Sequence, residues 1–146
     1  MKVYLDNCCF NRPYDNQSQL SIKLETEAKL RIQEWIKGQQ IHLVWSFMLD
    51  YENSVNPGAS KRNAISGWFR HASAFVEYND DIVLGAQQFV DKGFGKKDSI
   101  HLSCAIVGRA DYFITVDRGI LNKASKLSDI RVMDTVAFIR MAEETR

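Results

Sequence analysis

The chain has 146 residues, of which 45% are hydrophobic and 25% charged, so it has an ordinary globular composition and is long enough to bury a core. The net charge of +1 argues against a strongly basic or acidic chain. The three cysteines are too few and odd in number for a disulfide scaffold. No apolar stretch is long enough to predict a membrane span. We therefore expect one domain over residues 1–146, located in the cytoplasm, with no membrane contact.

The first part of the chain alternates short apolar runs with helical patterns. Residues Val3–Leu5 predict a strand, and a polar loop is expected from Asn7 to Ser18. Apolar residues recur at helical spacing from Leu20 to Ile36, which predicts a long helix. A second strand is predicted at Ile41–Trp45, followed by a helix to about Val55 that Ser46 caps.

The rest of the chain continues this alternation. The patterns predict in turn a polar helix from Lys61 to about Ser73, a short strand at Phe75–Tyr78, helices at Asp81–Asp91 and from Lys97 to near Gly108, strands at Tyr112–Val116 and Ile130–Met133, and a closing helix at Thr135–Glu144. Strands that alternate with helices are typical of an α/β fold. We expect a central parallel β-sheet flanked by helices on both faces.

Four carboxylates fall where a predicted strand ends or a helix begins. Asp6 closes the first strand, Glu52 lies early in the helix after the second strand, Asp98 opens a helix, and Asp117 closes the strand Tyr112–Val116. In an open parallel sheet, the carboxyl ends of the strands form one edge, where ligands bind. The four side chains are therefore expected to converge.

Element lengths support this for the last two acids. The helix that starts at Asp98 is about 18 Å long, and the strand from Asp111 to Asp117 covers about 20 Å in the opposite direction. The helix and the strand have nearly the same length, so the end of the strand comes back to the level of the start of the helix. This brings Asp98 close to Asp117. The same arithmetic places Asp111 at the opposite edge of the sheet.

Converging carboxylates imply a divalent cation, because they could not otherwise remain ionised together. Hard ions such as Mg²⁺ or Mn²⁺ prefer oxygen ligands and activate water against phosphodiesters. We assign Asp6, Asp98 and Asp117 to metal ligation, directly or through water, and Glu52 to holding a metal or orienting the attacking water. Thr115 lies two residues before Asp117, on the same side of the strand, and is expected to support the site.

Four segments resemble motifs of one known family. They are Lys2–Asn7, Ser46–Glu52, Asp98–Ala105 and Asp111–Arg118, and they resemble the opening strand, the Ser-then-Glu segment, the Asp-Ala-Leu-His-Leu-Ala-x-Ala helix start and the Asp-x-apolar-apolar-Thr-x-Asp strand of PIN-domain ribonucleases. This family includes the VapC-like toxins of bacterial toxin–antitoxin pairs. The resemblance implies a single PIN-like domain, a metal-dependent endoribonuclease that acts on RNA, a cognate antitoxin protein as a partner, and a homodimer formed through the helix after Asp15 or nearby apolar helices.

The resemblance refines the assignment of two positions. Glu52 is preferred to Asp50 as the second acid because it lies six residues after Ser46, as in the family pattern. The family usually has Asn two places after the first Asp, where this chain has Cys8. Either Asn7 takes over the hydrogen bond of that Asn, or the bond is absent.

Several basic residues lie near the predicted edge and are candidates for steering phosphate: Arg12, Lys96, Lys97, Arg118 and Lys123. We assign Arg12 and Arg118 to substrate binding; at any one position, an ordinary surface charge is an equal alternative. His101 lies one turn beyond Asp98 and could reach the metal, but a supporting or surface histidine is favoured. Glu25 and Glu27 lie on the long helix, and one of them could face the cleft, but a solvated position is favoured for both. The cysteines are interpreted as small core residues.

Two other classes of protein are compatible with parts of this pattern. A PIN-like module that binds RNA or protein without cutting it would account for Cys8, but it would not need all four acids. A phosphoaspartate receiver also has Asp residues at strand ends, but Asp6 lacks an acidic neighbour and Asp134 stands where a receiver has Lys. The preferred interpretation is therefore the nuclease.

Overall fold

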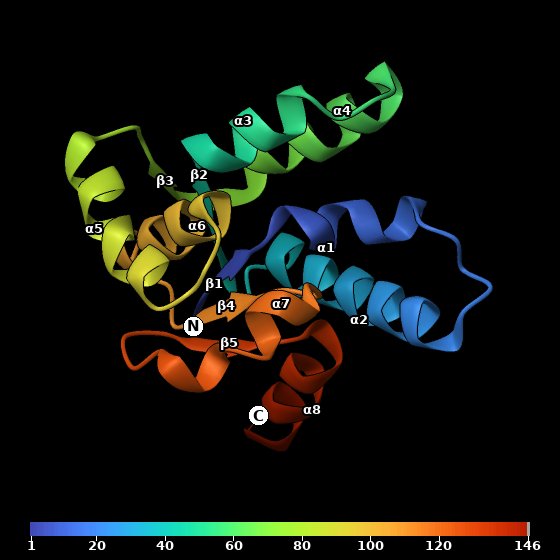
Figure 1. The fold of residues 1–146 in the computed structure, drawn as a ribbon. Helices are drawn as coiled ribbons and strands as arrows, with labels where there is room; N and C mark the ends of the chain where they lie inside the picture. The colour runs from blue at the N-terminus through green and yellow to red at the C-terminus, as the bar shows by residue number, and fades with distance from the viewer. Residues whose placement is uncertain (146) are drawn as a thin grey trace.

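A computed structural model describes residues 1–145. Its centre is one five-stranded sheet with the strand order β3-β2-β1-β4-β5, in which all neighbours are parallel. The strands are β1 (Lys2–Leu5), β2 (His42–Ser46), β3 (Ala72–Val76), β4 (Tyr112–Ile114) and β5 (Arg131–Met133) (Figure 1). The predicted α/β fold with a central parallel sheet is confirmed.

Helical segments connect the strands. They are α1 (Asn7–Asn11), η1 (Arg12–Tyr14), α2 (Leu20–Lys37), α3 (Phe47–Ser54), α4 (Ala59–Ser66), η2 (Gly67–His71), α5 (Asp80–Asp91), α6 (Lys96–Val107), α7 (Arg118–Leu121), η3 (Ala124–Lys126) and α8 (Thr135–Thr145), where η marks a 3₁₀ helix. Three predictions were wrong in detail. The strand predicted at Phe75–Tyr78 lies earlier in the chain, as β3 at Ala72–Val76. The segment predicted as a loop from Asn7 begins with α1 and η1, and the helix predicted at 61–73 is split into α4 and η2, which leads straight into β3.

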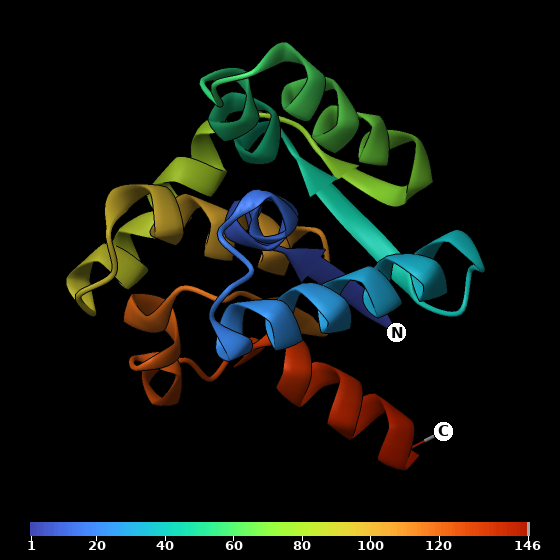
Figure 2. The ribbon, with the colours of Figure 1, turned by 90° about the vertical axis from the view of Figure 1, so that its right-hand side faces the viewer.

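The helices form a layer on each side of the sheet. Helix α2 packs against α8, and α5 packs against α6; the two pairs lie on opposite sides of the strands (Figure 2). Because both faces are covered, the central strands are continuously apolar. Val3, Tyr4 and Leu5 of β1 and Leu43 to Trp45 of β2 are fully buried.

The end of α6 comes unusually close to the sheet. A Cβ atom on Gly108 would lie 2.5 Å from Cγ1 of Val44 and 3.0 Å from Cγ2 of Val76, which is closer than side chains can pack. The missing side chain lets α6 lie against β2 and the chain turn into β4. This contact fixes the far end of the helix that begins beside Asp98.

None of the helices within residues 1–145 is both long and apolar enough to cross a membrane.

Candidate functional site

Asp6 is held at the carboxyl end of β1 by its neighbours on both sides. Its backbone N–H donates to the carbonyl of Ile114 at 2.9 Å, which continues the pairing of β1 with β4. Its carboxylate Oδ1 accepts the N–H of Asn7 at 2.8 Å and caps α1. Asp6 is buried, so the position of its carboxylate is fixed by the fold.

Thr115 connects two of the predicted acids. Its hydroxyl donates to Oδ2 of Asp6 at 2.8 Å and accepts the backbone N–H of Asp117 at 3.1 Å. The side chain is fully buried just beyond β4. The residue predicted to support the site therefore holds the Asp6 carboxylate and the backbone of Asp117 in one arrangement.

Asp117 has a structural contact of its own. Its Oδ1 accepts the N–H groups of Gly119 at 2.7 Å and Ile120 at 3.3 Å, so it caps the short helix α7. This is the ordinary role of an Asp at a helix start. Asp117 follows shortly after the end of β4, and its charge is near enough to Asp98 to raise the pKa of that carboxyl group.

Asp98 lies in the first turn of α6, and its environment places it among the other acids. Burial, followed by the charges of Asp6, Asp117 and Glu52 and against an opposing effect of His101, raises the pKa of Asp98 from 3.8 to about 6. Like charges act in this way only over short distances. The carboxylates that the sequence predicted to converge thus lie within electrostatic reach of one another.

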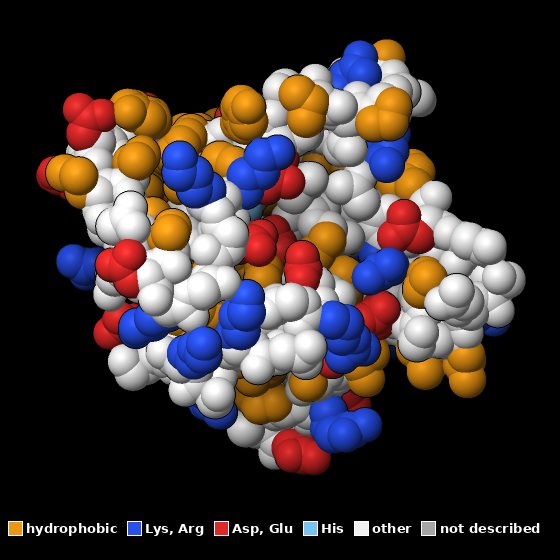
Figure 3. Space-filling model, in the orientation of Figure 1, with side chains coloured by type: hydrophobic (Ala, Val, Ile, Leu, Met, Phe, Trp, Pro, Cys, Tyr) orange, Lys and Arg blue, Asp and Glu red, His pale blue; other side chains and the backbone are white. Residues whose placement is uncertain are grey.

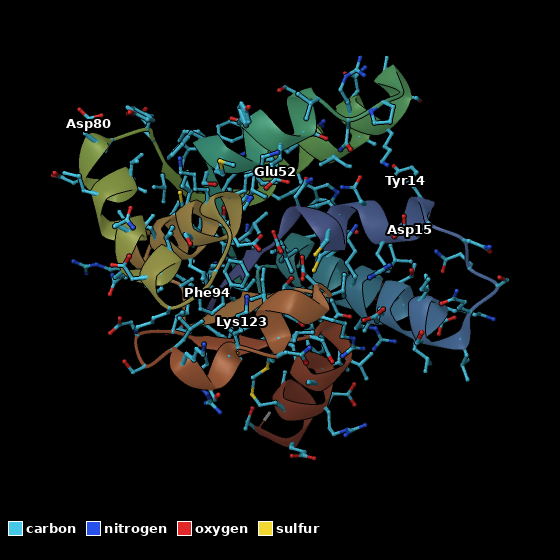
Figure 4. The ribbon with its side chains drawn as sticks, in the orientation of Figure 1. Tyr14, Asp15, Glu52, Asp80, Phe94 and Lys123 are labelled. Atoms are coloured by element: carbon cyan, nitrogen blue, oxygen red, sulfur yellow. The ribbon has the colours of Figure 1, made fainter. Side chains whose placement is uncertain are left out.

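Glu52 approaches from α3 and is held by a histidine. Its Oε1 lies 2.6 Å from Nε2 of His101, and its Oε2 accepts the Asn7 amide at 3.4 Å. Burial would raise the pKa of Glu52, but His101, followed by Lys97 and Asn7, outweighs this and lowers it. Figure 4 shows Glu52 extending from α3 toward the centre of the molecule. The ionised form of this carboxylate is therefore favoured.

His101 is the supporting histidine of the two kinds favoured by the sequence, and not the surface one. The side chain is fully buried and lies 4.0 Å from Oδ1 of Asp6 in addition to its contact with Glu52. The signal was its spacing of three residues from Asp98, which places both on the same side of a helix. It is not a surface histidine.

Asp50, the alternative to Glu52 as the second acid, has a structural contact with Trp45. Its Oδ1 accepts the indole N–H of Trp45 at 2.9 Å, which ties α3 to the strand before it. Asp111 is also remote, because its carboxylate accepts the backbone N–H of Lys2 at 2.8 Å, at the opening end of β1. Both positions agree with the choice of Glu52 and Asp117.

The side chain of Cys8 contacts Asp6, whereas the side chain of Asn7 contacts Glu52. The Cys8 thiol lies 3.4 Å from Oδ2 of Asp6 and 3.3 Å from the Thr115 hydroxyl. Its pKa is raised, first by a hydrogen bond with Cys9 and then by burial, so the thiol stays protonated and donates. The Asn7 amide instead reaches Glu52. Cys8 is therefore a weak donor to the site rather than a core residue alone.

The basic residues assigned to the substrate have a carboxylate partner. Arg12 and Arg118 lie 3.6 Å and 3.8 Å from the carboxylate of Glu25. Glu25 is buried, so its interpretation as a solvated residue was wrong. Arg118 remains largely exposed, whereas Arg12 is mostly covered and also pairs with Asp15.

The surface around the acids is basic. Asp and Glu side chains gather in the hollow at the centre of Figure 3, and Lys and Arg side chains surround it. Lys97 is near enough to Glu52 to affect its pKa. Lys123, labelled in Figure 4, instead donates to the carbonyl of Gly93 at 2.6 Å and helps to fix the chain just before α6.

In the arrangement seen, no three His, Cys, Asp or Glu side chains of residues 1–145 are grouped so that they could jointly hold a metal ion. Both oxygens of Asp6 and Oδ1 of Asp117 already accept protein hydrogen bonds. These carboxylates therefore lie near one another, but they do not form a preformed metal-binding site.

Comparison with known proteins gives matches in structure alone. No protein-family model matches the chain, and no curated protein matches its sequence.

Three solved structures match nearly the whole chain. VapBC-1 from nontypeable Haemophilus influenzae has a TM-score of 0.58 and 17% identity, over 92% of this chain and 98% of the other. FitAcB from Neisseria gonorrhoeae has a TM-score of 0.56 and 13% identity, over 91% and 97%. VapBC2 from Rickettsia felis, in a structure that includes a DNA fragment from the VapBC2 promoter, has a TM-score of 0.55 and 13% identity, over 92% and 98%. The chain has the PIN-like fold of these structures, which confirms the resemblance predicted from the sequence.

Proposed function

We propose that this protein is a metal-dependent endoribonuclease that hydrolyses phosphodiester bonds in RNA. One observation carries the proposal: Asp6, Asp98 and Asp117 come from three separate elements, yet they lie so close that burial and the other two charges raise the pKa of Asp98 to about 6. A cluster of this kind destabilises the folded protein unless a cation balances it. Such a cost is typical of a functional site.

The residues fit a hard divalent cation in their chemistry. The donors are carboxylate oxygens, which Mg²⁺ and Mn²⁺ prefer, and burial together with the negative charges of Asp6 and Asp117 raises the pKa of Asp98. Asp6, Asp98 and Asp117 would hold the ion, directly or through water. When bound, it would neutralise charge on the phosphate and lower the pKa of a bound water.

Other side chains of the protein position the acids of the proposed site. Thr115 orients the Asp6 carboxylate, and Asn7 contacts Glu52. Glu52 has a lowered pKa, so it is ionised and suited to accept a hydrogen bond from an attacking water and orient it. Arg118 follows Asp117 in the chain and is largely exposed, so it is the better of the two assigned arginines for contacting a phosphate of the substrate; Arg12 is mostly covered.

The proposed substrate is single-stranded or looped RNA. The positive side chains that surround the acids in Figure 3 suit a polyanion whose scissile phosphate reaches the acids while neighbouring phosphates contact the rim. Unpaired RNA can be bent into such a hollow more readily than a duplex.

The finer proposal is a toxin of a type II toxin–antitoxin pair, acting in the cytoplasm. Its support is the VapC-like sequence resemblance together with the fold shared with VapBC-1, VapBC2 and FitAcB. The partner would be a cognate antitoxin protein. Leu20, Leu24 and Leu30 of α2 are exposed, which supports a homodimer formed through this helix.

A second candidate is a catalytically inactive PIN-like module that binds RNA or protein. Two observations favour it: Cys8 contacts Asp6 where the family usually has Asn, and the acids of residues 1–145 do not form a ready-made metal cage. A module without catalysis need not bind Mn²⁺. Metal binding therefore separates the two candidates.

The test is cleavage of a panel of structured and single-stranded RNAs with Mg²⁺, Mn²⁺ or EDTA. Wild type is compared with Asp6→Asn and Asp98→Asn, and with Asp111→Asn as a matched control, because Asp111 is a carboxylate at the opposite end of the sheet. We expect cleavage that requires metal, is lost in the two site variants and persists in the control. No cleavage and no thermal stabilisation by Mn²⁺ would favour the binding module.

A further inference from the structure

A chain of buried hydrogen bonds leads from the core of the sheet to Glu52. The Tyr4 hydroxyl lies 2.7 Å from the Ser46 hydroxyl and 2.6 Å from Nδ1 of His101. Nε2 of the same ring lies 2.6 Å from Oε1 of Glu52. Tyr4, Ser46 and His101 are all fully buried.

We propose that Tyr4 and His101 are positioning residues for Glu52: Tyr4 fixes the His101 ring, and the ring fixes one carboxylate oxygen of Glu52. This inference rests on the proposed nuclease function for its catalytic consequence, but not for the geometry itself. It assigns a role to two residues that the metal and its ligands leave unexplained.

The direction of the bonds supports the proposal. An ionised carboxylate can only accept, so Nε2 of His101 carries a hydrogen and donates to Glu52. The bond made by the other ring nitrogen sets the orientation of a histidine, and here that partner is Tyr4. The pKa of Tyr4 is raised well above its usual value, mainly by burial, so its hydroxyl keeps its hydrogen.

The anchor of this chain is rigid. The Tyr4 ring is stacked on Phe113 of β4, with centroids 5.4 Å apart, and meets the His101 ring edge-on at 5.7 Å. Ser46 also accepts the N–H of Leu49 at 3.2 Å, as the cap of α3. The helix that carries Glu52 and the histidine that holds it are therefore tied to the same tyrosine.

This arrangement leaves Glu52 little freedom at the mouth of the site. Oε1 is fixed by His101 and Oε2 contacts Asn7. A group that orients a water has to be held within a fraction of an ångström of its working position. Loss of the Tyr4 hydroxyl is expected to loosen Glu52 without moving Asp6, Asp98 or Asp117.

The decisive variant is Tyr4→Phe, because it removes one hydroxyl and keeps the buried ring. We expect kcat for RNA cleavage to fall about ten-fold, as is usual when a supporting partner of a site is removed, while KM for RNA and the dissociation constant for Mn²⁺ stay unchanged. Tyr112→Phe is the matched control. Its hydroxyl contacts Met141 and Arg131, at the opening end of β4, and its loss should leave kcat unchanged.

A second readout does not depend on activity. In the wild type, the Nε2 hydrogen of His101 should give a slowly exchanging low-field NMR signal, which Glu52→Gln shifts. Tyr4→Phe should weaken this signal or speed its exchange. If wild type cleaves no RNA but the signal responds in this way, the nuclease proposal fails and the positioning of Glu52 stands.

Three results would overturn the positioning proposal. The first is an unchanged kcat in an active Tyr4→Phe enzyme, and the second is an unchanged His101 signal in that variant. The third is a change in KM or in Mn²⁺ affinity in place of kcat, because Tyr4 would then act on substrate or metal binding.

Discussion

The hydroxyl of Thr115 lies 2.8 Å from Oδ2 of Asp6, a buried hydrogen bond across 109 residues of sequence. The same hydroxyl accepts the N–H of Asp117. One side chain thus ties the ends of two neighbouring strands to each other and to two of the proposed metal ligands. The pairing of β1 with β4 makes this contact possible.

Thr115→Val is expected to damage both stability and activity. The change leaves the Asp6 oxygen and the Asp117 N–H without this partner, at a cost of about 1–3 kcal/mol in the free energy of unfolding. With Asp6 less well oriented, kcat should fall about ten-fold or more. Urea denaturation and RNA cleavage measure the two effects.

Thr115→Ser is the control for this change, because it keeps the hydroxyl. It should retain most of the activity even if it loses some packing. Equal losses of activity in the Val and Ser variants would mean that the methyl group, and not the hydrogen bond to Asp6, is what the site requires.

The contact of α6 with the sheet gives a prediction for stability alone. A Cβ on Gly108 would lie 2.5 Å from Val44, so Gly108→Ala should lower the free energy of unfolding by about 1–3 kcal/mol, as overpacking does. Gly38→Ala is the control: Gly38 also ends a helix, and its added Cβ would lie 3.4 Å from the nearest atom. Urea denaturation of both variants checks the prediction, and equal stabilities would contradict it.

Much of the fold and the rough position of the site could be predicted because they follow from local patterns. Apolar runs fix the strands, and the parallel order brings their carboxyl ends to one edge. The placement of Asp98 beside Asp117 required only the lengths of a helix and a strand.

Helix α1 could not be predicted in the same way. Asn7–Asn11 has a sequence of weak helix formers, and it is helical because Asp6 caps it and because Cys9 and Phe10 are buried. Tertiary packing overrides propensity here. Of the polar residues that suggested a loop here, Asn7 contacts Glu52 and Asn11 donates to the carbonyl of Asn7.

The hydrogen-bond and ion-pair partners of the polar residues could not be predicted from the sequence either. Tyr4 has the pattern of a core strand residue, and nothing local indicates that its hydroxyl reaches His101, which is 97 residues away. Glu25 likewise has the pattern of an exposed helix position, yet two arginines from distant segments meet it. Such contacts depend on how the elements pack and not on spacing within any one of them.

The two arginines that meet Glu25 should behave differently when they are removed. Arg12 is mostly covered, and Arg12→Ala would leave the buried Glu25 poorly compensated, so the free energy of unfolding should fall by about 2 kcal/mol, less than for a fully buried pair. Arg118 is largely exposed, so Arg118→Ala should change stability by less than about 1 kcal/mol.

Arg118→Ala is instead expected to weaken RNA binding. If Arg118 contacts a phosphate, the slope of log affinity against log salt should decrease by about one. The measurement is RNA binding over a range of salt concentrations, beside urea denaturation. A large loss of stability in Arg118→Ala with an unchanged salt slope would contradict the assignment.

The stability of the metal-free protein should depend on pH through Asp98. Its pKa is raised in the folded state to about 6, by burial and by the charges of Asp6 and Asp117. A raised pKa stabilises the fold fully below the unfolded value of about 3.9, and this contribution is lost as the pH rises through the folded value. In EDTA, Asp98→Asn should therefore melt at a higher temperature than wild type near neutral pH, and this advantage should vanish below about pH 4.

Metal ions should remove the same penalty. Mn²⁺ competes with the proton for the carboxylates, so it should raise the melting temperature of wild type more near neutral pH than in mild acid, and raise that of Asp98→Asn less. Thermal denaturation with Mn²⁺ or EDTA across this pH range gives both comparisons, and Asp111→Asn should follow wild type throughout. If Asp98→Asn is no more stable than wild type in EDTA at neutral pH, the carboxylates do not repel one another, and the main support for the metal site is gone.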